Sequence, residues 1–223
     1  MNVELLQHSL IVSCQAPADS PLHDPVVIAA MAEAAVKQGA KGVRIDTPAH
    51  VKAVRRRLPD TPIIGLWKQQ IPGCEVYITP RFADAAAIAE AGADIIALDG
   101  TLRDRPNKEI LHHIIPRVRN ELGKLVMADA DSLEGAKEAV RVGADFVGTT
   151  LYGYTQATQN LSPPGWKLLS QCVEQLEVPI ICEGGIASPE MAQKALQLGA
   201  YAVVVGAAIT GIDLKVKAFL EQM

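Results

Sequence analysis

The stretch EAGADIIALDG, residues 90–100, leaves a helical pattern, turns at a Gly-Ala step and continues as a run of aliphatic residues. Three other segments have the same order: KQGAKGVRID (37–46), RVGADFVGTT (141–150) and QLGAYAVVVG (197–206). The glycines of the four steps lie 51 to 56 residues apart: Gly39, Gly92, Gly143 and Gly199. A glycine between a helix and a strand is typical of a helix that ends at a left-handed cap. The chain therefore contains an internal repeat.

Each repeat is long enough for two strand-plus-helix units, so a second strand is expected between neighbouring Gly-Ala steps. The segments that supply it are SLIVSCQ (9–15), TPIIGLWK (61–68), GKLVMADAD (123–131) and VPIICEGG (178–185). The expected strands are 9–13, 42–46, 62–67, 94–99, 125–129, 145–149, 179–183 and 202–206. Eight alternating units predict an α/β fold, a (β/α)₈ TIM barrel, with residues 1–223 as one domain. An open doubly wound sheet is the alternative. The eight units are regularly spaced and leave no segment unassigned, which favours a closed barrel.

The composition agrees with a parallel sheet wrapped in helices, because 49% of the 223 residues are hydrophobic and only 4% are aromatic. A net charge of −4 argues against a nucleic-acid surface. No apolar run reaches the roughly 18 to 20 residues that span a bilayer, and no basic leader precedes the first strand. The four cysteines lack metal-ligand spacing and are expected to be reduced thiols: Cys14, Cys74, Cys172 and Cys182. We therefore expect a cytoplasmic protein without a membrane segment or a metal site.

In a TIM barrel the chemistry lies at the carboxyl ends of the strands. Polar and ionisable residues gather at these positions: Gln15, Arg44, Asp46, Lys68, Asp99, Asp129, Asp131 and Glu183. Each of them alone also fits a structural role. Asp46 and Asp99 in particular are equally suited to capping a helix or to pairing with a buried cation.

Lys68 and Glu183 differ from the others because strands three and seven lie opposite each other in a ring of eight. A base on one wall and an acid on the other can reach opposite faces of one bound carbon atom. Such a pair can remove a proton from one face and return one to the other, which inverts a stereocentre. Taken alone, Lys68 also fits a surface lysine, and Glu183 fits a structural ion pair.

Glycines follow strands seven and eight, where many barrels bind phosphate. Gly184 and Gly185 follow Glu183, and Gly206 with Ala207 ends the eighth strand. Their backbone N–H groups can approach an anion closely, so we expect these four residues to bind a phosphate group.

With these residues in place, the chain resembles the N-acetylmannosamine-6-phosphate 2-epimerases over nearly its whole length. The matching blocks include IVSCQA (11–16), PIIGLWK (62–68), ALDGTLRDRP (97–106), GTTLYGYT (148–155) and EGGIASPEMAQKALQLGAYAVVVGAAIT (183–210). The combination of ALDGTLRDRP with GTTLYGYT is specific, because generic phosphate-binding barrels lack it.

The resemblance implies interconversion of N-acetyl-D-mannosamine 6-phosphate and N-acetyl-D-glucosamine 6-phosphate without a metal or an organic cofactor. It places the family's catalytic lysine and glutamate on Lys68 and Glu183. It also implies that Arg44 neutralises developing negative charge, while Gln15 and Asp129 hydrogen-bond the sugar. The resemblance also implies a homodimer, since the family usually forms dimers. The pathway implied is the metabolism of amino sugars and sialic acid.

Three positions depart from the family's pattern. An arginine expected near position 211 is Gly211, a serine is replaced by Tyr152, and an alanine is replaced by Gly100. The first departure removes one side-chain contact to phosphate, so we expect the same reaction with altered affinity.

Two other functions stay open on the sequence. One is a Schiff-base aldolase on the same barrel, with Lys68 as its nucleophile. The other is a sugar-phosphate-binding protein without catalysis.

Overall fold

The computed structural model describes residues 3–223. Within them, eight parallel strands form a closed barrel in sequence order, and the register pairs Ser9–Val12 of the first strand with Ala202–Val205 of the last. The strands are β1 (Ser9–Cys14), β2 (Gly42–Asp46), β3 (Ile63–Leu66), β4 (Ile95–Asp99), β5 (Leu125–Asp129), β6 (Phe146–Gly148), β7 (Ile180–Cys182) and β8 (Ala202–Val205). The predicted TIM barrel is confirmed, and the β1–β8 pairing excludes the open sheet.

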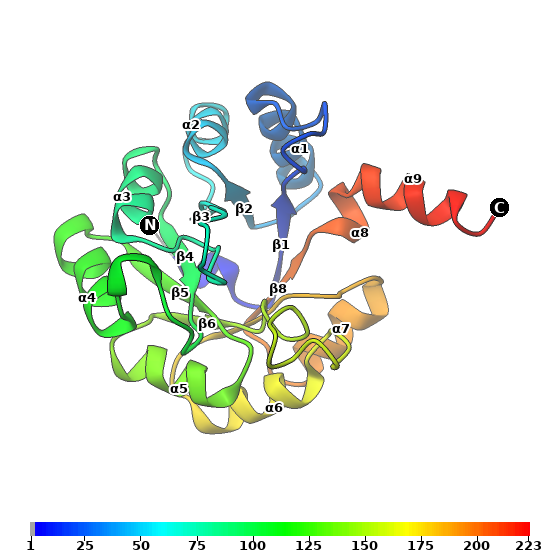
Figure 1. The fold of residues 1–223 in the computed structure, drawn as a ribbon. Coiled ribbons are helices and arrows are strands. Elements are labelled where there is room, and N and C mark those ends of the chain that lie inside the picture. The colour runs from blue at the N-terminus through cyan, green and yellow to red at the C-terminus, as the bar shows by residue number, and fades with distance from the viewer. Residues whose placement is uncertain (1–2) are drawn as a thin grey trace.

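Helices surround the strands, as Figure 1 shows. They are α1 (Pro25–Lys37), α2 (Pro48–Arg57), α3 (Phe82–Glu90), α4 (Leu111–Leu122), α5 (Leu133–Arg141), α6 (Trp166–Gln175), α7 (Pro189–Gln197), α8 (Ala207–Thr210) and α9 (Ile212–Leu220). Short 3₁₀ turns precede β1 and α4, at η1 (Val3–Leu6) and η2 (Pro106–Lys108).

Local sequence signals set the helix ends. The side chains of Asp24, Ser132 and Ser188 accept hydrogen bonds from the first backbone N–H groups of α1, α5 and α7. The four glycines of the Gly-Ala steps have φ angles between 93° and 108°, which only glycine adopts readily. The predicted helix terminations are therefore confirmed.

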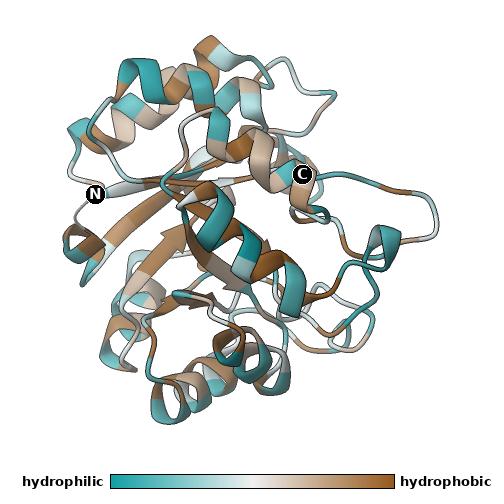
Figure 2. Cartoon of the chain, turned by 90° about the vertical axis from the view of Figure 1, so that its left-hand side faces the viewer, coloured by the Kyte–Doolittle hydropathy of each residue, from teal (hydrophilic) through white to brown (hydrophobic). Residues whose placement is uncertain are grey.

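The barrel is filled by aliphatic side chains, and two further clusters lie between the strands and the helices. Figure 2 shows hydrophobic strands inside helices whose outer faces are hydrophilic. Four strands, β3, β6, β7 and β8, end one residue earlier than expected, whereas β1 ends one residue later. Lys68, Glu183 and Gly206 therefore each follow a strand instead of ending it.

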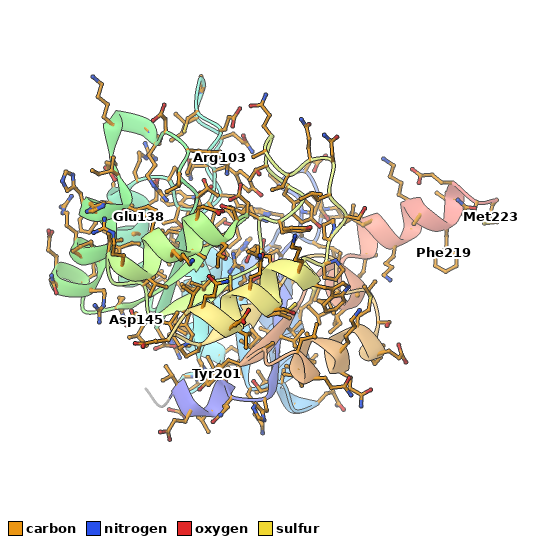
Figure 3. All side chains as sticks on the ribbon, turned by 90° about the horizontal axis from the view of Figure 1, so that it is seen from below. Arg103, Glu138, Asp145, Tyr201, Phe219 and Met223 are labelled. Carbon is orange, nitrogen blue, oxygen red and sulfur yellow. The ribbon has the colours of Figure 1, made fainter. Side chains whose placement is uncertain are left out.

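The C-terminal segment differs from the expected repeat. The helix after β8 has only four residues, and α9 then leaves the barrel and projects into solvent (Figures 1 and 3). None of the side chains of α9 is buried. Its first turn is tied to the β1–α1 loop, where Ser20 Oγ donates to the Asp213 carboxylate. Among residues 3–223, the helices are all too short or too polar to cross a membrane.

Candidate active site

Arg44 lies at the centre of the barrel mouth. It is the middle residue of β2, a strand buried along its whole length, and its side chain is 2% exposed. Nη1 and Nη2 donate to the two carboxylate oxygens of Asp129 at 3.1 and 2.6 Å, and Nη1 lies 3.1 Å from Glu183 Oε2. Burial acts to lower the pKa of Arg44, but the two carboxylates raise it more, so its net pKa shift is upward. The guanidinium is therefore a fixed positive charge.

Asp129 is the last residue of β5 and is fully buried. Besides the two bonds from Arg44, it accepts a bond of 2.6 Å from Thr150 Oγ1. Each of its two carboxylate oxygens thus accepts at least one hydrogen bond. The Nε atom of Arg44 is different: it is buried and has no hydrogen-bond partner among the residues that the structure describes.

Glu183 is the first residue after β7, and its side chain is 12% exposed. Burial raises the pKa of Glu183 to about 7; Arg44 opposes this rise, and the charge of Asp129 adds to it. Near neutral pH both the protonated and the ionised carboxyl are then populated. A group in this condition is suited to general acid–base chemistry.

Lys68 lies two residues after β3, with its backbone fixed and its side chain exposed. Its backbone N–H donates a hydrogen bond of 2.9 Å to Asp46 Oδ1, and its backbone forms a short antiparallel bridge with Ile78. Its Nζ donates 2.6 Å to Gln15 Oε1. The side chain of Lys68 is thus exposed but has a hydrogen-bond partner at the barrel mouth.

The expected opposition of Lys68 and Glu183 agrees with the barrel order, because β3 and β7 are four strands apart in a closed ring of eight. The positive charge of Lys68 is also one of those that act to lower the pKa of Glu183, so both groups share one mouth. Gln15 follows β1, and its side-chain amide donates a hydrogen bond of 2.9 Å to Ser13 Oγ.

Asp99 has a structural role. Its carboxylate accepts from the Thr101 N–H and hydroxyl at 2.9 and 2.6 Å and pairs with Arg103 at 2.6 Å. Asp46 instead supports Lys68, and burial raises the pKa of Asp46 while Lys68 opposes the rise. Of the two carboxylates whose roles stayed open, one thus orders the β4–α4 loop and the other positions a site residue.

The two glycine loops follow neighbouring strands. Gly184 and Gly185 have φ angles of 97° and 70°, and a Cβ atom on Gly185 would lie 2.6 Å from Pro163 Cβ. Only glycine fits there. Gly206 caps the start of α8, with Ala207 as the first helical residue. Since β7 and β8 are paired, the structure brings both loops to one side of the mouth.

The three departures have local explanations. A Cβ atom on Gly211 would lie 2.8 Å from both Cα and the carbonyl oxygen of Ala207, so this turn has no space for the expected arginine. A Cβ atom on Gly100 would lie 2.9 Å from Ala128 Cβ, which excludes alanine without a shift. The ring of Tyr152 packs against Gly165.

Two site residues were not singled out from the sequence, although both lie in the GTTLYGYT block. Thr149 and Thr150 follow β6, and their hydroxyl groups contact Glu183. Tyr77 also lies near the site: burial raises its pKa, and the charges of Asp129 and Asp99 raise it further. Among residues 3–223, no group of three or more His, Cys, Asp or Glu side chains is arranged to hold a metal ion.

Comparison with known proteins gives one consistent picture. A family model described as "Putative N-acetylmannosamine-6-phosphate epimerase" matches residues 28–223. Proteins named "Putative N-acetylmannosamine-6-phosphate 2-epimerase" are 66% identical in Thermosynechococcus vestitus and 64% identical in Synechococcus elongatus, each covering 98% of this chain and 94% of the relative. The solved N-acetylmannosamine-6-phosphate 2-epimerase from Clostridium perfringens is 36% identical, with a TM-score of 0.94 over 100% of this chain and 96% of that one.

A more distant structure supports the fold alone. The 3-hexulose-6-phosphate synthase from Salmonella typhimurium is 17% identical, with a TM-score of 0.65 over 96% of this chain and 99% of that one. The resemblance inferred from the sequence blocks is confirmed by the closer comparisons.

Proposed function

The chain belongs to the N-acetylmannosamine-6-phosphate epimerase family, and from this premise we propose that it interconverts N-acetyl-D-mannosamine 6-phosphate and N-acetyl-D-glucosamine 6-phosphate. One observation carries the proposal for this chain's own residues. A glutamate whose pKa is raised to about 7 by burial shares the barrel mouth with a lysine four strands away. This is the pair of groups that inversion at one carbon requires.

The chemistry needs no change of redox state. Opening of the sugar ring gives an aldehyde at carbon 1, which acidifies the proton on carbon 2. Either Lys68 or Glu183 takes this proton, and the electron pair of the C–H bond forms an enolate with its negative charge on oxygen 1. The other group then delivers a proton to the opposite face of carbon 2, and the aldehyde is restored as the epimer.

The remaining site residues support these steps. Arg44 supplies a fixed positive charge that favours the enolate over the neutral aldehyde. Gln15 orients the ammonium group of Lys68, and Asp129 holds Arg44. We assign further hydrogen bonds to Gln15 and Asp129, from the sugar hydroxyl or N-acetyl groups. We assign the phosphate to the backbone N–H groups of Gly184, Gly185, Gly206 and Ala207.

The test is proton NMR of N-acetylmannosamine 6-phosphate with the purified protein in deuterated water, with Lys68→Ala and Glu183→Ala as variants. We expect the gluco epimer to appear with deuterium at carbon 2, and both variants to lose it. Exchange without inversion would mean that one group acts alone. No exchange and no product with the wild-type protein would refute the epimerase and leave sugar-phosphate binding.

Borohydride separates the epimerase from a Schiff-base aldolase. An aldolase forms an imine between Lys68 Nζ and the substrate carbonyl, and reduction traps it as a stable adduct. We expect intact-mass spectrometry to show no adduct after borohydride treatment in the presence of substrate. A mass increase equal to the reduced substrate, lost in Lys68→Ala, would favour the aldolase.

We also propose that the protein is a cytoplasmic homodimer. The argument for the dimer is the exposed apolar surface of α9, whose Phe219 and Leu220 are 72% and 66% exposed, together with Ile212, Leu214 and Val216. Figure 3 shows Phe219 on the projecting helix and Met223 beyond its end, both away from the barrel. A groove of about 390 Å³ lies beside β1, β8 and α7, lined in part by Leu10, Pro189, Leu196 and Val203.

We propose that a second copy of the chain exchanges its α9 and covers the exposed apolar residues in this groove. The assay is light scattering after gel filtration, with Phe219→Asp and with Lys217→Ser on the same helix as the control. We expect a dimer for the wild-type protein and the control, and a monomer for Phe219→Asp. A wild-type monomer at micromolar concentration would refute the dimer.

A further inference from the structure

Two consecutive threonines at the end of β6 hold Glu183 from its neighbouring strand. The backbone ladder between β6 and β7 ends at Gly148 and Ile181. Beyond it, the buried hydroxyl of Thr149 accepts from the Glu183 N–H at 3.1 Å and donates to the Glu183 carbonyl oxygen at 2.9 Å. This one side chain satisfies both backbone groups of the residue that carries the proposed acid–base carboxyl.

Thr150 acts on the carboxyl group itself. Its Oγ1 lies 2.6 Å from Asp129 Oδ1 and 3.3 Å from Glu183 Oε2. A hydroxyl group has one proton, so its positive end lies between two carboxyl groups whose negative charges repel each other. The proton can point to one carboxylate or be shared between the two, and the carboxylate that accepts it is favoured in its ionised form.

The space around this hydroxyl depends on a glycine. A Cβ atom on Gly148 would lie 2.8 Å from Thr150 Oγ1 and 3.1 Å from Asp129 Oδ1. No side chain fits at this position without displacing the hydroxyl or the carboxylate. The close approach of Thr150 to Asp129 therefore depends on a strand residue without a Cβ atom.

We propose that Thr150 is a positioning residue for the reaction: its hydroxyl group holds the Glu183 carboxyl beside Arg44 and keeps it able to ionise. This inference rests on the proposed function, in which Glu183 exchanges a proton with carbon 2. Thr149 fixes the backbone of Glu183, and Thr150 fixes the direction and the charge of its side chain.

The charged groups that face Glu183 come from several elements. Arg44 of β2 and Lys68 after β3 favour its ionised form, whereas Asp129 of β5 and burial favour its protonated form; Thr150 after β6 is on the side of ionisation. Removing the hydroxyl takes a donor from Glu183 and also leaves the charge of Asp129 less compensated. Both effects make Glu183 harder to ionise.

The variants are Thr150→Val, which keeps the shape, and Thr150→Ser, which keeps the hydroxyl. Thr155→Val is the matched control, because the Thr155 hydroxyl bonds the carboxylate of Asp131 at 2.7 Å in the same loop without touching Glu183. For Thr150→Val we expect kcat to fall roughly 10- to 100-fold, as expected when a hydrogen bond to a charged group is lost, with a smaller change in KM.

The pH profile separates positioning from a merely structural role. The acid limb of kcat/KM reports protonation of Glu183, so in Thr150→Val it should move to higher pH by about half a unit to one unit. Thr150→Ser should restore both kcat and the limb. An unchanged acid limb of kcat/KM in Thr150→Val would overturn the proposal. A shift of this limb to lower pH would also overturn it, because it would mean that the hydroxyl accepts a hydrogen bond from protonated Glu183.

A second readout does not depend on activity. Carbon-13 labelling of the glutamate carboxyl groups gives a titration of Glu183 by NMR, with Glu183→Gln identifying its resonance. A higher pKa of Glu183 in Thr150→Val supports the inference even if the wild-type protein fails to epimerise the substrate, which would refute only the proposed function. Equal titrations in the wild type, Thr150→Val and Thr155→Val would refute the inference even if the enzyme is an epimerase.

Discussion

Replacing Glu183 by glutamine should make the protein more stable at alkaline pH. Burial raises the pKa of Glu183 from the ordinary 4.5 to about 7. The folded protein therefore binds a proton more readily than the unfolded chain between these values. The stabilising contribution of this group is complete below pH 4.5 and is lost as the pH rises through 7.

The size of the effect follows from the shift. A difference of about 2.5 pKa units corresponds to about 3 kcal/mol of unfolding free energy. Glutamine keeps the shape of the side chain and has no charge at any pH. The stability difference between Glu183→Gln and the wild type should therefore grow by about 3 kcal/mol between pH 5 and pH 8.5.

Urea unfolding at a series of pH values measures this difference. In thermal unfolding the same change amounts to about 6 to 12 °C for a chain of this size. Groups that titrate equally in both proteins, such as His50, cancel when the two curves are subtracted. Glu190→Gln is the control: a hydrogen bond with Ser188 lowers the pKa of Glu190, so its difference from wild type should stay constant over this range.

Parallel curves for Glu183→Gln and the wild type would refute the reasoning. They would mean that Arg44 and Lys68 compensate fully for the burial of the carboxyl group. A wild-type protein that gains stability relative to Glu183→Gln as the pH rises would mean that the ion pair with Arg44 dominates and lowers the pKa instead.

Three further predictions concern single residues of the site. Lys68→Met should fold normally and lose epimerisation by a factor of about 10² to 10⁴, because it removes one of the two groups that we propose to transfer protons; single-turnover NMR measures the loss, and a smaller one would assign the chemistry elsewhere. Arg44→Ala should destabilise the protein by about 3 to 5 kcal/mol in urea unfolding, since Asp129 and Glu183 lose their buried cation; wild-type stability would mean that the carboxyl groups protonate at little cost. Gly185→Ala should raise KM for the phosphorylated sugar more than it lowers kcat, because its side chain clashes with Pro163 in the loop assigned to phosphate; an unchanged KM would remove that assignment.

The barrel itself was predictable because its signals are local. A glycine at positive φ followed by aliphatic residues marks the change from helix to strand before β2, β4, β6 and β8, and these four Gly-Ala steps repeat at nearly constant spacing. The strand ends were less accurate. Lys68 and Glu183 follow continuous apolar runs, but whether a residue still belongs to a strand depends on its backbone pairing, which the sequence of one strand does not contain.

The path of the C-terminal helix was not predictable for a related reason. The residues of α9 alternate between apolar and polar in a manner that also suits a helix packed on the barrel. Between α8 and α9 the chain turns at Gly211, which lies close to the backbone of Ala207. A single glycine in the sequence gives no indication of the direction of this turn.

The position of Arg44 was predictable, but its partners were not. Arg44 and Asp129 are 85 residues apart, and they meet because side chains from β2 and β5 cross the inside of the barrel. The role of Thr150 was equally hidden, since the sequence places it after a strand and only the closed barrel brings it between two carboxyl groups.

The same cluster explains why a raised pKa at Glu183 is compatible with a stable fold and with the proposed proton transfer. Arg44 and Asp129 neutralise each other, so a protonated Glu183 leaves the buried group uncharged and an ionised Glu183 leaves it with one negative charge. Folding favours the first state, and accepting a proton from carbon 2 requires the second. With a pKa near 7, the two states differ little in free energy at neutral pH, so the carboxyl group can act in both directions of a reversible epimerisation. A stronger ion pair would stabilise the fold above pH 7 and at the same time leave a weaker base.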